Sequence, residues 1–129
     1  MKEQKKISQA LENYLKEIYM MESEGAQVRV TDIAEILNIS KASVNKAVNA
    51  LKAQGFLSHE HYGKIELTED GREIAQNLAD NYKICHRFLT EFLDVPERTA
   101  SEEAGQMSHI ISRATRKKLK KFMKKQKKE

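Results

Sequence analysis

The sequence predicts a mainly α-helical chain that carries one small β-hairpin. Apolar residues recur at helical spacing over most of the chain, whereas alternation with a period of two is confined to residues 56–67. Residues 31–55 spell two short helices with a tight turn between them. Together these observations predict a winged helix-turn-helix module over residues 1–70, followed by a helical domain over residues 71–129.

The first expected helix covers residues 8–24, and Gly25 is placed to end it. Its apolar stripe fits one helix face: Leu11, Tyr14, Leu15, Ile18 and Tyr19. A second helix is expected to start at Thr31 as its cap, with Asp32 in the first turn. Asn38 tolerates the left-handed exit that a tight turn needs, and Ile39 is expected to fill that turn.

The third expected helix is capped by Ser40, runs to about residue 54 and ends at Gly55. Its buried stripe is formed by Val44, Val48 and Leu51. The opposite face presents short polar and cationic groups: Lys41, Ser43, Asn45, Lys46 and Asn49. Residues 56–67 then alternate around a turn at residues 62–64, which predicts the hairpin, with Ile65 and Leu67 facing inward.

The second half begins with a long helix that opens at Thr68, followed by two acidic residues at its positive end. Its stripe is long enough for a second core or a partner chain: Ile74, Leu78, Tyr82, Cys85, Phe88, Leu89 and Phe92. Residues 94–97 break it at Pro96. A further helix is expected to carry Ala100, Ala104, Met107, Ile110 and Ile111, and the basic C-terminal tail keeps Leu119, Phe122 and Met123 at helical spacing.

Charge is distributed unevenly along the chain. The net charge is +4, but residues 113–129 hold ten Lys and Arg and one Glu, whereas residues 1–112 hold 13 Lys and Arg and 18 Asp and Glu. The body is therefore acidic, at −5, and the tail is basic, at +9. The single cysteine, Cys85, excludes an intrachain disulfide. Without a membrane-length apolar run or a signal sequence, a cytoplasmic location with no membrane partner is expected.

The predicted module favours binding to double-stranded DNA over catalysis. We find no nucleophile elbow, phosphate loop, HExxH or CxxC motif, so an enzyme is not expected. Hydroxyl, amide and ammonium groups on a helix that follows a tight turn can reach phosphates and base edges in the major groove. A winged-helix module that binds a protein partner is the alternative.

Five segments carry a resemblance to a known family: LENYLKEIYMM, RVTDIAEILNISKASVNKAVNALKAQGFL, YGKIELTEDGREIA, HRFLTEFLDV and SEEAGQMSHIIS. The chain resembles the diphtheria-toxin-repressor and manganese-transport-regulator family, in the short form without the SH3-like domain. The resemblance implies a homodimeric, metal-activated transcription repressor that binds a palindromic operator. With the polar helix face it gives the expected DNA contacts: Ser40, Lys41, Ala42, Ser43, Asn45, Lys46 and Asn49, and His61, Tyr62 and Lys64 on the wing.

The family's metal positions are degenerate in this sequence. The positions at which relatives carry ligands are occupied by Asn13, Lys16, Tyr82, Gly105 and Ser108, and only His109 matches. His86 stands where longer members use a glutamate for an ancillary site. A hard divalent ion needs two or more carboxylates, which these residues do not supply. We therefore expect the usual manganese or iron site to be absent, so no cofactor is assigned with confidence.

Three interpretations of the altered metal positions stay open. The ammonium of Lys16 could replace the charge of the metal ion, with Glu102 or Glu103 as a partner. A transition metal could instead use a new soft-ligand set, with His86 and His109 as the candidate ligands alongside Cys85 and Met107. The third interpretation keeps DNA binding but replaces the metal with a small organic effector.

Overall fold

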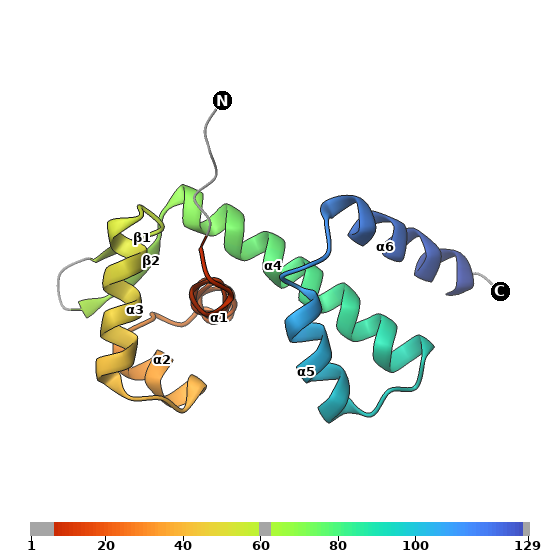
Figure 1. Cartoon of the computed structure of the whole chain (residues 1–129), viewed down its shortest axis with the longest axis horizontal. Coiled ribbons are helices and arrows are strands. Elements are labelled where there is room, and N and C mark those ends of the chain that lie inside the picture. The colour runs from red at the N-terminus through yellow and green to blue at the C-terminus, as the bar shows by residue number, and fades with distance from the viewer. Residues whose placement is uncertain (1–6, 60–62, 128–129) are drawn as a thin grey trace. The chain divides into compact units, whose positions relative to one another are not determined.

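The computed structural model describes residues 7–59 and 63–127, and it divides into two compact units between Gln76 and Asn77. The elements in chain order are α1 (Gln9–Ser23), α2 (Val30–Leu37), α3 (Lys41–Ala53), β1 (Leu57–His59), β2 (Ile65–Leu67), α4 (Glu69–Arg87), a π-helical turn (Phe88–Phe92), α5 (Glu97–Met107) and α6 (Arg113–Lys127) (Figure 1). The expected fold class, mainly α-helical with one small hairpin, is confirmed.

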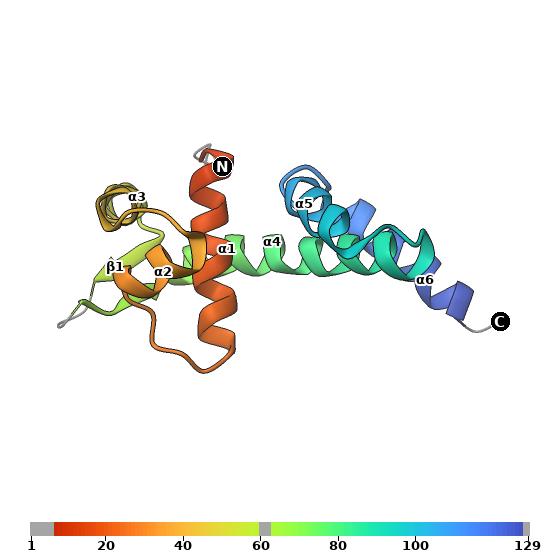
Figure 2. The ribbon, with the colours of Figure 1, turned by 90° about the horizontal axis from the view of Figure 1, so that it is seen from below.

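The first unit buries the faces that the periodicity predicts. Its core joins residues of α1, α2, α3 and the hairpin: Leu15, Ile18, Ile33, Val44, Val48, Leu51, Leu57 and Ile65. Each such side chain contributes about 1.5–3 kcal/mol by leaving water. Figure 2 shows α1, α2, α3 and the hairpin from a second side. The buried face of α3 is thereby fixed, and its opposite face is left to solvent.

The start of α2 differs from the prediction. The helix begins at Val30, so Thr31 lies inside its first turn and is not the cap. The Asp32 carboxylate accepts a hydrogen bond from the backbone N–H of Arg29 at 2.9 Å, and this satisfies the helix entry instead. The helix ends as predicted at Asn38, whose φ of 55° is left-handed. The turn is closed by the backbone N–H of Ile39, which donates to the carbonyl oxygen of Ala34, and the Ile39 side chain is 37% exposed.

The hairpin is antiparallel and pairs Leu57 with Leu67 and His59 with Ile65. A third backbone segment joins its base, because the N–H of Ile65 donates to the carbonyl oxygen of Val28 at 2.8 Å. The inward residues of β2, Ile65 and Leu67, are buried as predicted. The wing is therefore tied to the segment that precedes α2 as well as to α3.

The junction between hairpin and α4 is closed around Thr68. Its hydroxyl accepts from the N–H of Gly71 at 3.1 Å and donates to the carbonyl oxygen of Gly55 at 2.6 Å, so the predicted helix cap also fastens the end of α3. A side chain at Gly71 would overlap the carbonyl oxygen of Phe56. Only glycine fits this close approach of two backbone segments.

The second unit packs α5 and α6 with the C-terminal part of α4 and its π-helical turn. Its core consists of Ile84, Cys85, Leu89, Ala100, Ala104 and Met123. The expected helix over residues 100–111 is too long, because α5 ends at Met107. Ile110 lies in the following turn and is 73% exposed, so it is not a core residue. The tail residues form α6, which buries Met123 but leaves Phe122 48% exposed.

A buried polar network holds the turn between α5 and α6. The side chain of Asn81 is fully buried, and its amide donates to the carbonyl oxygens of Ser108 and Ile111 at 2.9 and 3.3 Å. Its amide oxygen accepts from Arg116 Nη1 at 2.9 Å, and Arg116 also donates to the Asn77 side chain at 2.6 Å. Nothing in the periodicity of the sequence indicated this network.

Candidate nucleic-acid interface

The outward face of α3 is built by its cap and its buried stripe. Ser40 has an extended backbone, and its hydroxyl accepts from the N–H of Ser43 at 3.1 Å and donates to the Ser43 hydroxyl at 2.9 Å. The buried residues of α3 fix the rotation of the helix about its axis. All the residues predicted to touch DNA from this helix are consequently exposed: Ser40, Lys41, Ala42, Ser43, Asn45, Lys46 and Asn49.

The chemistry of this face fits a duplex groove. Lys41 and Lys46 can pair with phosphates, while Asn45 and Asn49 carry amides of the kind that make bidentate bonds to adenine. The first turn of α3 holds no acidic residue, so its free backbone N–H groups and positive dipole end favour an anion. The arrangement combines phosphate anchors with base-edge donors and acceptors on one rigid element.

The wing is described only in part. His61 and Tyr62 lie outside the described residues. Lys64 is half-buried, and it forms a backbone bridge with Arg29 at the base of the hairpin. Lys64 is the one expected wing contact that the structure describes, and its backbone pairs with that of a second cationic residue, Arg29.

Two exposed apolar side chains lie close to this face in the sequence, and the sequence analysis did not assign them to it. Ile36, near the end of α2, is 55% exposed, and Ile39 directly precedes the cap of α3. Ile36 falls outside the buried positions of α2, Ile33 and Ala34, so the helical period could have revealed it. Apolar groups of this kind can contact the methyl group of thymine.

The positions that correspond to metal ligands in the family do not supply suitable donors. In the first unit, Lys16 is only 5% exposed, and burial lowers its pKa, although Glu17 partly offsets this. In the second unit, the Ser108 hydroxyl donates to the carbonyl oxygen of Gly105 at 2.7 Å. An ammonium group has no lone pair to offer a cation, and glycine has no side chain. This donor set does not fit a hard divalent ion.

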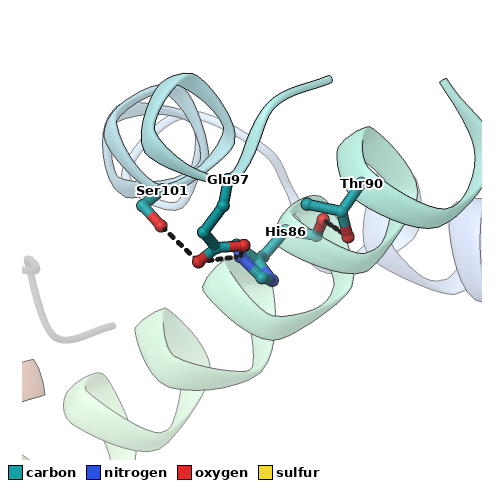
Figure 3. A network of polar contacts seen from close by, with 4 residues as sticks. All are labelled: His86, Thr90, Glu97 and Ser101. Carbon is teal, nitrogen blue, oxygen red and sulfur yellow. Dashed lines mark hydrogen bonds and ion pairs between the residues drawn. The ribbon is translucent and has the colours of Figure 1, made fainter. Parts of the chain in front are cut away.

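His86 is held by a neighbouring carboxylate. Its Nε2 lies 2.9 and 3.0 Å from the two carboxylate oxygens of Glu97, which also accepts a hydrogen bond from Ser101 at 2.9 Å (Figure 3). The ring stacks on Tyr82, with centroids 5.8 Å apart. The hydrogen bond from His86, followed by that from Ser101, lowers the pKa of the Glu97 carboxyl. This pair connects α4 to the first turn of α5 and engages Nε2 of His86.

Cys85, one residue of the alternative soft-ligand set, lies in a core position. Cys85 is a free thiol that is fully buried in the core of the second unit, and burial raises its pKa, which disfavours the thiolate that binds metals. Across residues 7–59 and 63–127, no three side chains of His, Cys, Asp or Glu are grouped so that they could hold a metal ion. In the same residues no helix is both long and apolar enough to cross a membrane.

Comparison with protein-family models identifies both halves of the chain. Residues 6–65 match the N-terminal DNA-binding domain of the iron-dependent repressors. Residues 68–129 match the metal-binding and dimerisation domain of the same repressors. The two matches together cover nearly the whole sequence, and they correspond to the α3-bearing half and to the α5- and α6-bearing half.

Individual relatives agree with these family models. An uncharacterized HTH-type transcriptional regulator of Methanocaldococcus jannaschii is 38% identical over 120 residues, which is 92% of this chain and 96% of the relative. The HTH-type transcriptional regulator MntR of Geobacillus kaustophilus is 32% identical over 103 residues, covering 80% and 72% of the two chains. The solved structure of the manganese regulator SloR superposes with a TM-score of 0.77 at 25% identity, over 88% of this chain and 53% of that one.

Proposed function

The chain belongs to the iron-dependent repressor family of DNA-binding transcriptional regulators, and from this premise we propose that it is a homodimeric, sequence-specific repressor that acts in the cytoplasm without the family's metal ion. Its membership makes it a regulator of transcription and not an enzyme. The dimer, the operator and the loss of metal dependence are the proposed parts.

A single observation carries the DNA-binding proposal. The polar face of α3 is exposed from Ser40 to Asn49, while the apolar face of the same helix is locked into the core of the first unit. A helix that follows a tight turn and presents ammonium, amide and hydroxyl groups is suited to the major groove. Two copies of this surface would engage two half-sites of a palindromic operator.

The dimer proposal is supported by the second unit. Its family model describes a dimerisation domain. Leu93 and Phe122 are large apolar side chains that remain about half exposed in the single chain. Burying them against a second copy would remove apolar surface from water.

Selection of duplexes from a random pool tests the proposed function. We expect enrichment of an inverted repeat that binds two chains per duplex, with half-sites separated by about one helical turn. Mass determination of the purified complex gives the stoichiometry. Two results together would instead support the protein-interaction alternative. The pool would yield no enriched motif, and a protein partner would still bind after charge removal at Lys41, Lys46 and Lys64.

The proposed loss of metal dependence is supported by the donor set. Lys16 and Gly105 provide no ligand atom from their side chains, and the Ser108 hydroxyl is engaged with a backbone carbonyl. Asn13 and Tyr82 offer neutral oxygens in place of carboxylates. We accordingly propose that no resident divalent ion is needed for binding to DNA.

Replacing Lys16 with methionine tests the buried charge. Because burial lowers the pKa of Lys16, its environment disfavours the ammonium, and we expect Lys16→Met to raise the free energy of unfolding by about 1 kcal/mol near pH 7. The unfolded chain holds this proton more tightly than the folded one. The gain should therefore shrink as the pH rises through the folded pKa towards the ordinary value of 10.5.

Urea denaturation at a series of pH values measures this gain, and Lys52→Met, on the exposed side of α3, is the matched control. A loss of stability in Lys16→Met would contradict the account of a desolvated ammonium. Operator affinity measured on the same variant tests whether the charge also replaces the metal. If it does, affinity falls although stability rises.

A further inference from the structure

The exposed face of α6 carries most of the helix's lysines. Resting on the function proposed above, we propose that α6 binds the phosphates of duplex DNA through its lysines without reading the base sequence. The surface, called here the α6 lysine face, consists of Lys117, Lys118, Lys120, Lys121, Lys124 and Lys125, all of them exposed. It belongs to the second unit and is separate from α3 in the sequence.

The charged residues of α6 are all positive. Residues 113–127 contain nine Lys and Arg and no Asp or Glu. Within the described part of the chain, none of the six lysines takes part in a salt bridge. The remainder of the chain, residues 1–112, carries −5, so its net charge adds no long-range attraction for a polyanion. The net positive charge of the protein is thus concentrated on one helix, whose six exposed lysines have no salt-bridge partner among the described residues.

The α6 lysine face is held on an ordered scaffold. Ser112 caps the helix, with its hydroxyl accepting from the N–H of Thr115 at 3.1 Å. Arg116 bonds to Asn77 and Asn81, and Met123 is buried in the core of the second unit. At 15 residues the helix is about 22 Å long, which matches several phosphates along one strand.

The packing of α6 in the second unit favours a nucleic acid over a membrane as its partner. A basic amphipathic helix binds a bilayer by inserting its apolar side between the lipids. In α6 that side is already used, because Leu119 and Met123 pack in the core of the second unit. Phe122 alone remains half exposed. What α6 offers to a partner is therefore charge, and duplex DNA supplies a dense row of phosphates.

The salt dependence of DNA binding provides the test. A variant with all six lysines of the α6 lysine face changed to glutamine is compared with one in which they are changed to arginine, which keeps the charge. In the full-length protein, we expect the glutamine variant to reduce the slope of log Kd against log salt by about 3 units or more, whereas the arginine variant keeps it. Preference for the selected operator over a scrambled duplex should be unchanged.

Two further measurements keep the outcomes distinct. Circular dichroism confirms that α6 remains helical, and an additional set of Lys117→Gln, Lys121→Gln and Lys125→Gln replaces the full set if folding is lost. An unchanged slope in a folded glutamine variant overturns the proposal. A membrane role would also overturn it. In that case the wild-type protein binds phosphatidylcholine–phosphatidylserine vesicles, the glutamine variant does not, and the salt slope of DNA binding is the same in both.

Different results would refute the proposed function and this inference. If Asn45→Ala with Asn49→Ala, which removes the amides proposed to read base edges, leaves operator preference intact, the assignment of α3 is wrong, whatever α6 does. If that α3 variant loses its operator preference and the α6 glutamine variant keeps the full salt slope, the repressor proposal stands and the α6 proposal falls.

Discussion

Changing Lys41 and Lys46 together to glutamine should weaken binding to the selected operator by at least about 100-fold. Both ammonium groups are exposed on the N-terminal half of α3, where the proposed phosphate contacts would fix the register of the helix in the groove. In a dimer the variant removes four contacts, and each also contributes to the release of counterions. Fluorescence anisotropy with a labelled duplex at fixed salt measures the loss.

A matched control separates contact from net charge. Lys83→Gln with Arg98→Gln removes the same charge from exposed positions on α4 and α5. We expect this control to retain affinity within about threefold, because distant exposed charges are screened at moderate salt. Equal losses in the two double variants would contradict a specific role for α3.

Replacing Asn81 with leucine should lower the free energy of unfolding of the second unit by about 3 kcal/mol. The leucine side chain is close in size but cannot donate, so the carbonyl oxygens of Ser108 and Ile111 lose the partner that they share. Arg116 loses one of its two side-chain acceptors at the same time. Buried polar groups without partners bear the full cost of leaving water.

Urea denaturation followed by circular dichroism measures this loss. Gln76→Leu, an amide-to-leucine change at an exposed position of the same helix, serves as the control and should shift stability by no more than about 0.5 kcal/mol. Comparable effects in both variants would mean that leucine disturbs α4 itself. If Asn81→Leu leaves the free energy of unfolding unchanged, the buried network does not stabilise the turn between α5 and α6.

The parts of the fold that local chemistry dictates were predictable from the sequence. Ser40 caps α3, Thr68 caps α4, and Asn38 takes the left-handed conformation, because each choice depends on a few neighbouring residues. The apolar stripe of α3 also lay where its period placed it. These agreements explain why the outward face of α3 could be identified in advance.

The errors have two sources: a competing local cap at the start of α2, and a long-range contact at the end of α5. Thr31 is a good cap in isolation, but the Asp32 carboxylate accepts from the N–H of Arg29, so α2 has its cap at Arg29 and begins at Val30. Ile110 fitted the helical stripe of α5, yet the helix ends at Met107. The following turn is held from α4 by Asn81, and no local pattern encodes a contact over 27 residues. Periodicity detects faces of helices and does not detect polar contacts between them.

The metal positions could not be derived from spacing in this sequence. They were identified through family resemblance, and the structure adds the environments of individual residues, such as the buried ammonium of Lys16 and the carboxylate that holds His86. Two of the expected wing contacts, His61 and Tyr62, remain predictions because they lie outside the described residues. The α6 lysine face combines a visible charge pattern with a burial pattern that the structure alone supplied.

The most direct test of the central claim is operator binding by protein that has been stripped of metal with a chelator and then supplied separately with Mn²⁺, Fe²⁺, Zn²⁺ or Cu²⁺. If the degenerate positions have removed metal control, the dissociation constant will agree within about twofold in every condition, including the metal-free one. A rise in affinity of about tenfold or more with any one of these ions would contradict the account.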